Sequence, residues 1–364
     1  MTALQDNKPD HLDNLAFPLS DVVSNPMQVG GIETSVLDNG PGRGNRIAWI
    51  NTGSGLRCKI VIDRAMDIMD ACYNQYGLAW ISHPGTTAAY RSAHAGMEWL
   101  RSFGGGLLTT CGLSHVGGPE SDSFGERGLH GRISNLPAEL VSIEQPDIPH
   151  GKMEMSITGI TRETSVFGPS LEISRTISAK LGKPHISIRD EVRNAGNQTV
   201  PHMLLYHCNF GWPLVDEGTE IHWSGNWRSR GNEGDNKIFH EGHDFRKCLP
   251  PQADHSGTGE ACAFIEPGAD ARGTCICGLF NPKLILAVMI RFKKQELPCL
   301  CNWQHWGRGE YVTALEPATN QPAGQKKARE QGDLVLLEPG EARSYHLELQ
   351  VTQDPARIRE LTEI

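Results

Sequence analysis

Four stretches of this sequence place titratable side chains among apolar or glycine-rich neighbours. They are residues 99–113, 128–135, 202–211 and 302–317, and they contain Arg101, His130, His207, Asn209, Trp303, His305 and Glu316. A carboxylate inside an apolar strand, as at Glu316, is costly unless it is paired or lies in a cleft. Positioned carboxylates and imidazoles are among the side chains that most often perform general acid–base catalysis. The sequence therefore contains the parts of an acid–base site.

Each of these side chains also has an ordinary structural interpretation. Alternate residues of a strand share a face, so His207 lies with Met203 and Leu205 and also suits a hydrogen-bonded core position. Glu316 is compatible with a buried salt bridge, and Arg101 with an exposed position. The choice between structure and chemistry depends on whether the four stretches converge on one cleft.

Other motifs do not indicate a known chemistry. The run Gly104–Gly106 is not followed by Lys-Ser/Thr and does not belong to a G-x-G-x-x-G pattern that opens a helix, so it does not indicate a phosphate loop. No G-x-S-x-G motif surrounds Ser114, which argues against a serine nucleophile. The cysteines are scattered and lack the C-x₂₋₄-C pairs of zinc clusters. We expect them to pack as small apolar groups.

The elements that would position the four stretches are mostly short strands. Apolar residues alternate with period two, and turns such as Gly168-Pro169 separate segments of about ten residues. The predicted strands are residues 57–64, 68–73, 77–81, 153–160, 171–181, 185–194, 203–210, 221–223, 284–292 and 345–351. Short helices are expected at residues 87–99, 325–331 and 355–361. The pattern predicts an all-β fold of stacked antiparallel sheets, a large β-sandwich with a few short helices.

The domain organisation follows from what the chain lacks. No Ser/Gly-rich or charged linker divides it, so we predict one domain over residues 27–364 after an N-terminal tail or arm over residues 1–26. The N-terminus has no basic segment followed by an apolar stretch, which favours a cytoplasmic location. The longest apolar run, residues 284–290, is far shorter than the ~20 residues of a membrane span. No membrane partner is expected.

The charge balance is acidic, with 34 Lys and Arg against 43 Asp and Glu and a net charge of −9. Binding to a phosphate backbone needs clustered basic residues, so a nucleic-acid partner is excluded. A small anionic ligand is not excluded, because a few local arginines suffice to hold one. An exposed sheet edge would allow a homodimer.

Taken together, the four stretches resemble the aldose 1-epimerase, or galactose mutarotase-like, superfamily, and more narrowly its DUF4432-type branch. The segments that carry the resemblance are DRAMDI from Asp63, RSFGGGLLTTCGL from Arg101, GLHGRI from Gly128, YHCNFG from Tyr206 and ALEPAT from Ala314. The similarity runs from about residue 30 to residue 351. It implies a galactose mutarotase-like β-sandwich.

The resemblance also implies roles for individual residues. Glu316 is implied as the general base and His207 as the general acid that open a sugar ring, with no metal and no redox cofactor. Arg101 and His130 are implied as hydrogen-bond donors to the substrate. The remaining candidates for substrate binding are Arg64, Asn209, Trp303 and His305. The expected partner is a small-molecule carbohydrate.

The sequence departs from the common mutarotase pattern in two places. Residues 130–132 read His-Gly-Arg where His-Gly-Gly is frequent, and residues 317–319 read Pro-Ala-Thr where Pro-Asp-Ala often follows. The identity of the sugar therefore stays open. Arg64, Arg101 and Arg132 together would favour an acidic or phosphorylated sugar.

Two alternatives keep the fold and change the function. A metal-dependent sugar isomerase or epimerase would draw its ligands from His130, His202, His207, His305 and Glu316. His202 and His207 are five residues apart, however, and so face opposite sides of a regular strand. The other alternative is a non-catalytic carbohydrate-binding or sensing protein.

Overall fold

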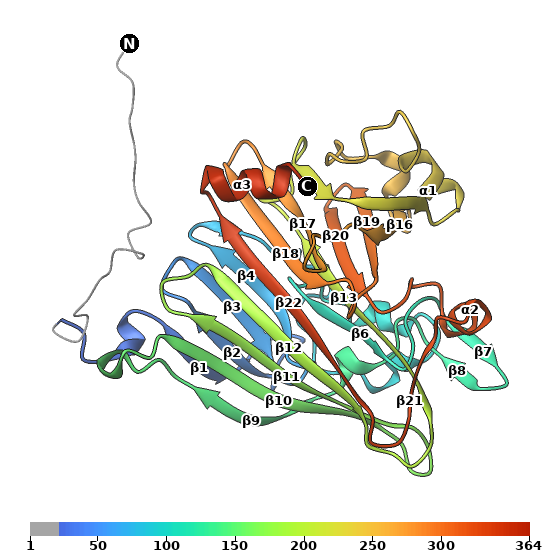
Figure 1. The fold of residues 1–364 in the computed structure, drawn as a ribbon, viewed down its shortest axis with the longest axis horizontal. Coiled ribbons are helices and arrows are strands. Elements are labelled where there is room, and N and C mark those ends of the chain that lie inside the picture. Colours follow the sequence, from blue (N-terminus) through green and yellow to red (C-terminus); the bar gives the residue numbers. More distant parts are fainter. Residues whose placement is uncertain (1–21) are drawn as a thin grey trace.

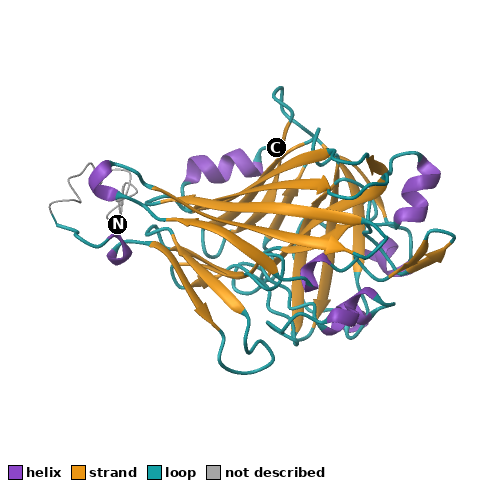
Figure 2. Ribbon diagram, turned by 90° about the horizontal axis from the view of Figure 1, so that it is seen from below, coloured by secondary structure: helices purple, strands orange, loops and turns teal. Residues whose placement is uncertain are grey.

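The computed structural model describes residues 22–364. The predicted tail over residues 1–26 therefore lies mostly outside the described residues. The fold is all-β, as predicted: strands form the body of the structure and the helices lie at its periphery (Figure 2). The strands of the sheets pair antiparallel throughout.

An eight-stranded sheet forms a broad layer across the structure (Figure 1). In spatial order its strands are β14 (Glu220–Trp223), β17 (Thr274–Asn281), β18 (Leu286–Lys293), β22 (Ala342–Thr352), β12 (His185–Asn194), β11 (Ser170–Lys180), β10 (Glu154–Thr164) and β9 (Ala138–Glu144). Buried residues alternate with more exposed ones along β10, β11 and β12. This alternation is what a sheet with one face on the core requires, and it explains the period-two pattern of the sequence.

A seven-stranded sheet carries most of the candidate residues. It consists of β15 (Gly225–Ser229), β16 (Ala261–Pro267), β19 (Cys299–Gly307), β20 (Glu310–Ala318), β13 (Val200–Phe210) and β21 (Val335–Leu337), with β6 (Thr109–Leu113) paired to β13. Nearly all of β13 is buried because both of its faces are covered. Leu204, Tyr206 and Phe210 belong to the main core, whereas Met203 and Leu205 pack with a second apolar cluster. The predicted division of this strand into two faces is confirmed.

A third sheet and several small elements complete the fold. The sheet is five-stranded, with β1 (Gly31–Val36), β2 (Arg46–Asn51), β3 (Leu56–Val61), β4 (Asp67–Tyr73) and β5 (Tyr76–Gly77). Strands β7 (Glu120–Asp122) and β8 (Gly125–Arg127) form a hairpin, and the α-helices are α1 (Glu233–Ile238), α2 (Gln325–Gln331) and α3 (Pro355–Thr362). Helices α2 and α3 were expected, whereas α1 was not.

The short helices expected over residues 87–99 form as 3₁₀ helices and not as an α-helix. Only two short 3₁₀ helices form there, Arg91–His94 and Glu98–Arg101. Between them Gly96 adopts a φ of 50°, a left-handed conformation that interrupts a right-handed helix. This segment instead brings Trp99 into the second apolar cluster.

The three large sheets share one apolar core. Ile60 of β3, Ile188 of β12 and Leu315 of β20 belong to the same buried cluster. This shared core favours one domain, which stays a prediction for residues 27–364, as do the homodimer and the cytoplasmic location. Within the part of the chain that the structure describes, none of the helices has the length and apolar character needed to cross a membrane.

Candidate active site

A cavity of about 510 Å³ is lined by residues of β13, β19 and β20. Five of the eight residues proposed from the sequence line it: His130, His207, Trp303, His305 and Glu316. Clefts of about 300–1,000 Å³ are typical of small-molecule sites. The four stretches of the sequence therefore converge on a space of the size that a small ligand requires.

The central feature of the cavity is the contact between Glu316 and His207. The antiparallel register of β13 and β20, which pairs Cys208 with Leu315 and Leu205 with Ala318, places His207 opposite Glu316. The imidazole Nε2 of His207 lies 3.2 Å from a carboxylate oxygen of Glu316. Both side chains are almost fully buried, 7% and 4% exposed. Two paired strands therefore hold the acid and the base side by side.

Burial shifts both groups toward their neutral forms. It raises the pKa of Glu316 to about 8; the neighbouring charge of Glu260 adds to the rise, and Arg230 opposes it. Burial lowers the pKa of His207 to about 4. Between these two values the pair holds one exchangeable proton, which favours the carboxyl group. A pair with one proton can donate at one atom and accept at the other.

His130 is presented to the cavity by a strained turn. Its φ is +55°, a left-handed conformation that few non-glycine residues adopt, and Gly131 follows with a φ of +70°. Its ring lies 5.0 Å from the ring of Trp99 and 6.1 Å from that of His207. Burial, reinforced by the neighbouring His207, lowers the pKa of His130 to about 3. The imidazole is therefore neutral near pH 7, so it can offer a hydrogen bond without adding a charge.

Aromatic rings surround the acid–base pair. The ring of His207 lies 5.2 Å from that of Phe103 and 5.5 Å from that of Trp303, measured between centroids. Trp99 stacks on Phe103 at 4.3 Å, and Trp80 contacts both Phe103 and Trp303. Such rings combine an apolar face with, in tryptophan, a polar edge. They suit a ligand whose faces are apolar and whose rim is polar, as in a pyranose.

Residues 42–351 match the family described as a domain of unknown function, DUF4432. The chain belongs to the DUF4432 family. No curated protein matches the sequence.

Solved structures share the fold of this DUF4432 protein. A Klebsiella pneumoniae protein provisionally described as an aldose 1-epimerase is 22% identical, with a TM-score of 0.83, over 93% of this chain and 89% of its own. A galactose mutarotase-like protein from Clostridium acetobutylicum is 13% identical, with a TM-score of 0.61, over 88% of this chain and 98% of its own. A protein from Escherichia coli K12, also provisionally described as an aldose 1-epimerase, is 14% identical, with a TM-score of 0.54, over 88% of this chain and 99% of its own. The DUF4432 chain therefore has a galactose mutarotase-like fold.

The structure does not bring two of the expected arginines to the cavity. Arg101 is 72% exposed and pairs with Glu98 at 2.9 Å, because the 3₁₀ turn that carries both directs them to the surface. Arg64 is buried, and its guanidinium donates to the backbone carbonyls of Ser134, Ser102 and Thr87. Such a guanidinium binds loops of the DUF4432 fold together, and the expectation that these two arginines line the ligand site is corrected.

Asn209 and Arg132 are also placed outside the cavity lining. The buried amide of Asn209 donates to the carbonyls of Gly106 and His207, so it supports the strand segment that carries His207. Arg132 donates to the carbonyl of Thr164. Arg64, Arg101 and Arg132 are the arginines that had favoured an acidic sugar, and none of them lines the cavity.

The cavity also contains a charged pair that the sequence analysis missed. Arg230 donates through Nε and Nη2 to both oxygens of Asp235, each at 2.9 Å, and its Nη1 lies 2.7 Å from Glu260. The other oxygen of Glu260 accepts from the indole N–H of Trp303 at 2.7 Å. The sequence does contain Asn232 and Asp235, which form a capping box at the start of α1. Such a pair indicates where a helix begins and does not indicate a ligand site.

His305, another expected residue, lines the cavity and is held on both sides. Its Nδ1 contacts the carbonyl of Gly259, and its Nε2 lies 3.3 Å from Glu310. Its ring stacks parallel to that of Trp303 at 6.1 Å. Of the five ligand candidates for the metal-site alternative, His202 contacts Leu113 and Tyr345 and does not line the cavity. Within residues 22–364, no three His, Cys, Asp or Glu side chains are grouped so that they could hold a metal ion.

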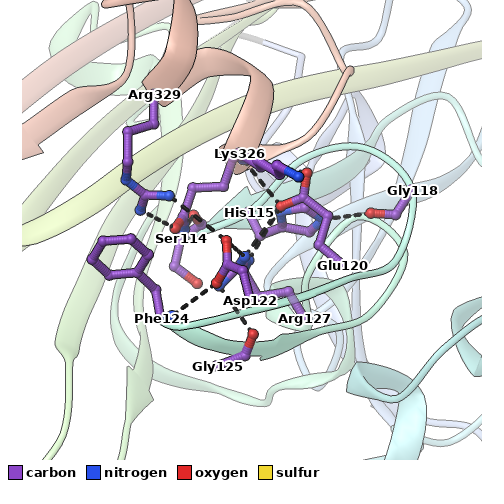
Figure 3. Close-up of polar contacts among 11 residues, drawn as sticks. Ser114, His115, Gly118, Glu120, Asp122, Phe124, Gly125, Arg127, Lys326 and Arg329 are labelled. Carbon is purple, nitrogen blue, oxygen red and sulfur yellow. Dashed lines mark hydrogen bonds and ion pairs between the residues drawn. The ribbon is translucent and has the colours of Figure 1, made fainter.

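The β7–β8 hairpin follows Gly118, a residue that lines the cavity, and Figure 3 shows its polar contacts. Glu120 of β7 lies opposite Arg127 of β8 in the register and contacts it at 3.3 Å. The same carboxylate accepts from the backbone N–H of Lys326 at 3.1 Å, at the start of α2. Asp122 pairs with Arg127 at 2.7 Å. These contacts join the hairpin to α2.

The hairpin network continues into the backbone beside His130. His115 Nε2 donates to the carbonyl of Gly118 at 2.8 Å (Figure 3). Gly117 and Gly118 line the cavity, and the carbonyl of Gly117 accepts from the backbone N–H of His130 at 2.9 Å. Glu120 follows Gly118 by two residues, and its contacts with Arg127 and Lys326 fix the chain next to the segment that bonds the strained His130.

Proposed function

We propose that this DUF4432 protein is an aldose 1-epimerase that interconverts the anomers of an uncharged aldose. The observation that carries the proposal is the 3.2 Å contact between Nε2 of His207 and a carboxylate oxygen of Glu316 in an aromatic-lined cavity. The galactose mutarotase-like fold of solved relatives described as aldose 1-epimerases supports it.

The proposed reaction requires one base and one acid. Glu316 removes the proton from the anomeric hydroxyl while His207 protonates the ring oxygen. The bond between the anomeric carbon and the ring oxygen breaks, and an aldehyde forms at the anomeric carbon. Rotation about the adjacent carbon–carbon bond exposes the other face of the aldehyde. Ring closure then returns each proton by the reverse steps, so atoms and electrons balance without a further reactant.

The single proton of the pair fits this cycle. Transfer of the proton from Glu316 to His207, across 3.2 Å, gives the carboxylate base and the imidazolium acid. Ring opening returns the proton to Glu316, and ring closure restores it to His207. Because the reaction runs in both directions, the two groups must exchange roles, and positioned groups of this kind contribute about 10²–10⁴-fold. Trp303 and Phe103, beside His207, would pack against the apolar face of the sugar.

The charges around the cavity favour an uncharged sugar. Arg230, the Lys or Arg side chain found among the described lining residues, is already bound to Asp235 and Glu260. Glu310 adds a further carboxylate beside His305. Among the described residues of the lining, an anionic sugar would meet carboxylates without a free cation, whereas neutral hydroxyls can donate to those oxygens and accept from the imidazoles.

The test is anomer exchange measured by NMR on purified protein with a panel of neutral aldoses. Glu316→Gln keeps the shape of the side chain and removes its ionisation, and His207→Gln removes the imidazole. We expect each variant to lose at least about 10²-fold in exchange rate. Glu241→Gln, at an exposed position, is the matched control and should exchange at the parent rate.

Three outcomes separate the proposal from its alternatives. Parent protein that binds aldoses without accelerating exchange would instead support a carbohydrate-binding or sensing role. Exchange that depends on added metal after chelation would support a metal-dependent enzyme. Variants at Glu316 and His207 that exchange as fast as the parent would show that the acid–base assignment is wrong.

A further inference from the structure

A second hollow, of about 260 Å³, adjoins the cavity. Thr258 and Glu260 line both spaces, so the two adjoin at these residues. The second hollow is otherwise lined by polar side chains and glycine backbone from the segment around α1 and from residues 254–260. None of the described side chains that line it is a large aliphatic one. Its ligand must therefore be held by hydrogen bonds.

Each cation at the second hollow is paired with carboxylates. Lys237 lies 3.5 Å from Asp254 and 3.6 Å from Glu233. Glu260 is bound by Arg230 and by the indole N–H of Trp303. No cation there lacks an anionic partner among the described residues, so a phosphate or a carboxylate gains little. Paired charges and neutral polar groups suit hydroxyls, which both donate and accept.

Glu260 connects the second hollow to the acid–base pair. Its carboxylate holds the indole of Trp303, whose ring lies 5.5 Å from that of His207. The negative charge of Glu260 is also close enough to Glu316 to contribute to its raised pKa. The second hollow thus begins beside the residues that would surround a single sugar ring.

The position of the reaction on the sugar decides what can extend into this space. The anomeric carbon and the ring oxygen must face Glu316 and His207. The hydroxyls on the far side of the ring, where a reducing disaccharide carries its next sugar, then point away from the pair. A substituent there needs a polar space next to the cavity, and the hollow around Lys237 and Asp254 is polar and adjoins the cavity at Thr258 and Glu260.

We propose that the preferred substrate is an uncharged reducing disaccharide or longer glycan. Its reducing-end ring lies at Glu316 and His207, and its next ring occupies the hollow lined by Lys237, Asp254 and Thr258. This inference rests on the proposed function for the placement of the reducing end. It assigns the hollow as a second sugar subsite, which binds part of the substrate and takes no part in the acid–base reaction.

The experiment compares the affinities of a disaccharide and of its own reducing-end monosaccharide by calorimetry on the full chain. The probes are maltose, cellobiose, isomaltose, lactose and melibiose, with glucose as their reducing-end reference. At least one disaccharide should bind at least about tenfold more tightly than glucose. The double variant Lys237→Ala/Asp254→Ala, at side chains 54% and 57% exposed, should reduce that ratio to about one.

A matched control uses another exposed pair from the same segment. Lys247 lies 3.1 Å from Asp244, and neither residue lines the hollow. Lys247→Ala/Asp244→Ala should keep the parent ratio. Equal affinity for every disaccharide and glucose would overturn the inference, and so would an unchanged ratio in the Lys237→Ala/Asp254→Ala variant.

Exchange rates on the same samples separate this inference from the proposed function. Accelerated anomer exchange of glucose, with no disaccharide binding more tightly than glucose, overturns the second subsite and leaves the acid–base proposal intact. Tight binding of a disaccharide that Lys237→Ala/Asp254→Ala abolishes, without anomer exchange, supports the subsite and contradicts the epimerase. Failure of all these sugars to bind overturns the second subsite, and the NMR panel of neutral aldoses decides the epimerase proposal separately.

Discussion

His207 and Glu316 are direct neighbours across two antiparallel strands, with 3.2 Å between the imidazole Nε2 and a carboxylate oxygen. Strand pairing sets this distance, so the acid and the base do not depend on a mobile loop for their alignment. The backbone of β13 at this point is itself held by the amide of Asn209. The rigid part of the fold therefore carries the proposed chemistry.

The rate of anomer exchange should depend on pH with a bell shape. Below about pH 4, His207 and Glu316 both hold a proton, so no base is available. Above about pH 8, Glu316 has lost its proton and the pair has no acid. The two apparent pKa values of the bell-shaped profile belong to the coupled pair and not to either residue alone. NMR exchange rates from pH 3.5 to pH 9.5 would measure the profile, and a rate that still rises above pH 9 would contradict it.

Glu120→Gln should weaken the site from a distance. The variant keeps the shape but loses the charge that holds Arg127 and the backbone N–H of Lys326, so the wall beside His130 loosens. We expect kcat/KM to fall about 3–10-fold, mostly through KM, because roughly 1 kcal/mol of support is lost. The ring resonances of His130 should shift with it. Glu126→Gln, exposed on the same hairpin, is the control, and equal effects of both variants would contradict the assignment.

Arg64→Met should act on stability and not on ligand affinity. The variant keeps the length of the side chain but leaves three backbone carbonyls, of Ser134, Ser102 and Thr87, without their donor. Buried groups that lose a charged partner cost about 3 kcal/mol in the free energy of unfolding. Denaturant unfolding checks this, with exposed Arg57→Met on β3 as the control. A raised KM at unchanged stability would instead place Arg64 in the binding site.

Acid should destabilise the protein through its buried histidines. Burial lowers the pKa of His202 from 6.5 to about 4; its Nδ1 contacts the carbonyl of Leu113 and its Nε2 the hydroxyl of Tyr345. The unfolded chain therefore binds more protons than the folded one between these values. The stabilising contribution is complete above about pH 6.5 and is lost as the pH falls toward 4.

The His202→Gln variant measures this contribution. Its free energy of unfolding should vary less between pH 4 and pH 6.5 than that of the parent, by up to about 3 kcal/mol. His150→Gln, at a side chain 81% exposed, is the matched control and should keep the parent dependence. The same pH dependence in His202→Gln and in the parent would show that His202 does not titrate as proposed.

Much of the site could be predicted because strand periodicity is local. Period two places His207 on the same face as Met203 and Leu205, and the structure packs those two residues in the cluster beside the cavity. Glu316 is recognisable because a carboxylate in an apolar strand costs free energy unless it is paired or lies in a cleft. The glycines around His130 likewise indicate a turn that presents the ring, and its φ of +55° agrees.

The directions of the arginines were decided only by the tertiary structure. Arg101 and Arg64 lie in segments that the sequence connects with the site, yet one turns to the surface and the other binds three backbone carbonyls. A long flexible side chain turns toward the nearest carboxylate or carbonyl oxygen. Which oxygen is nearest depends on how segments distant in the chain pack together.

By itself, then, the sequence determined the all-β fold, the two faces of β13 and the acid–base candidates, since these depend on alternation and local polarity. Only the tertiary structure decided the 3.2 Å contact of His207 with Glu316, the Arg230–Glu260 pair and the hollow beside it. The physical reason is that distances, burial and pKa shifts arise from groups that are far apart in the chain and meet only when the sheets pack.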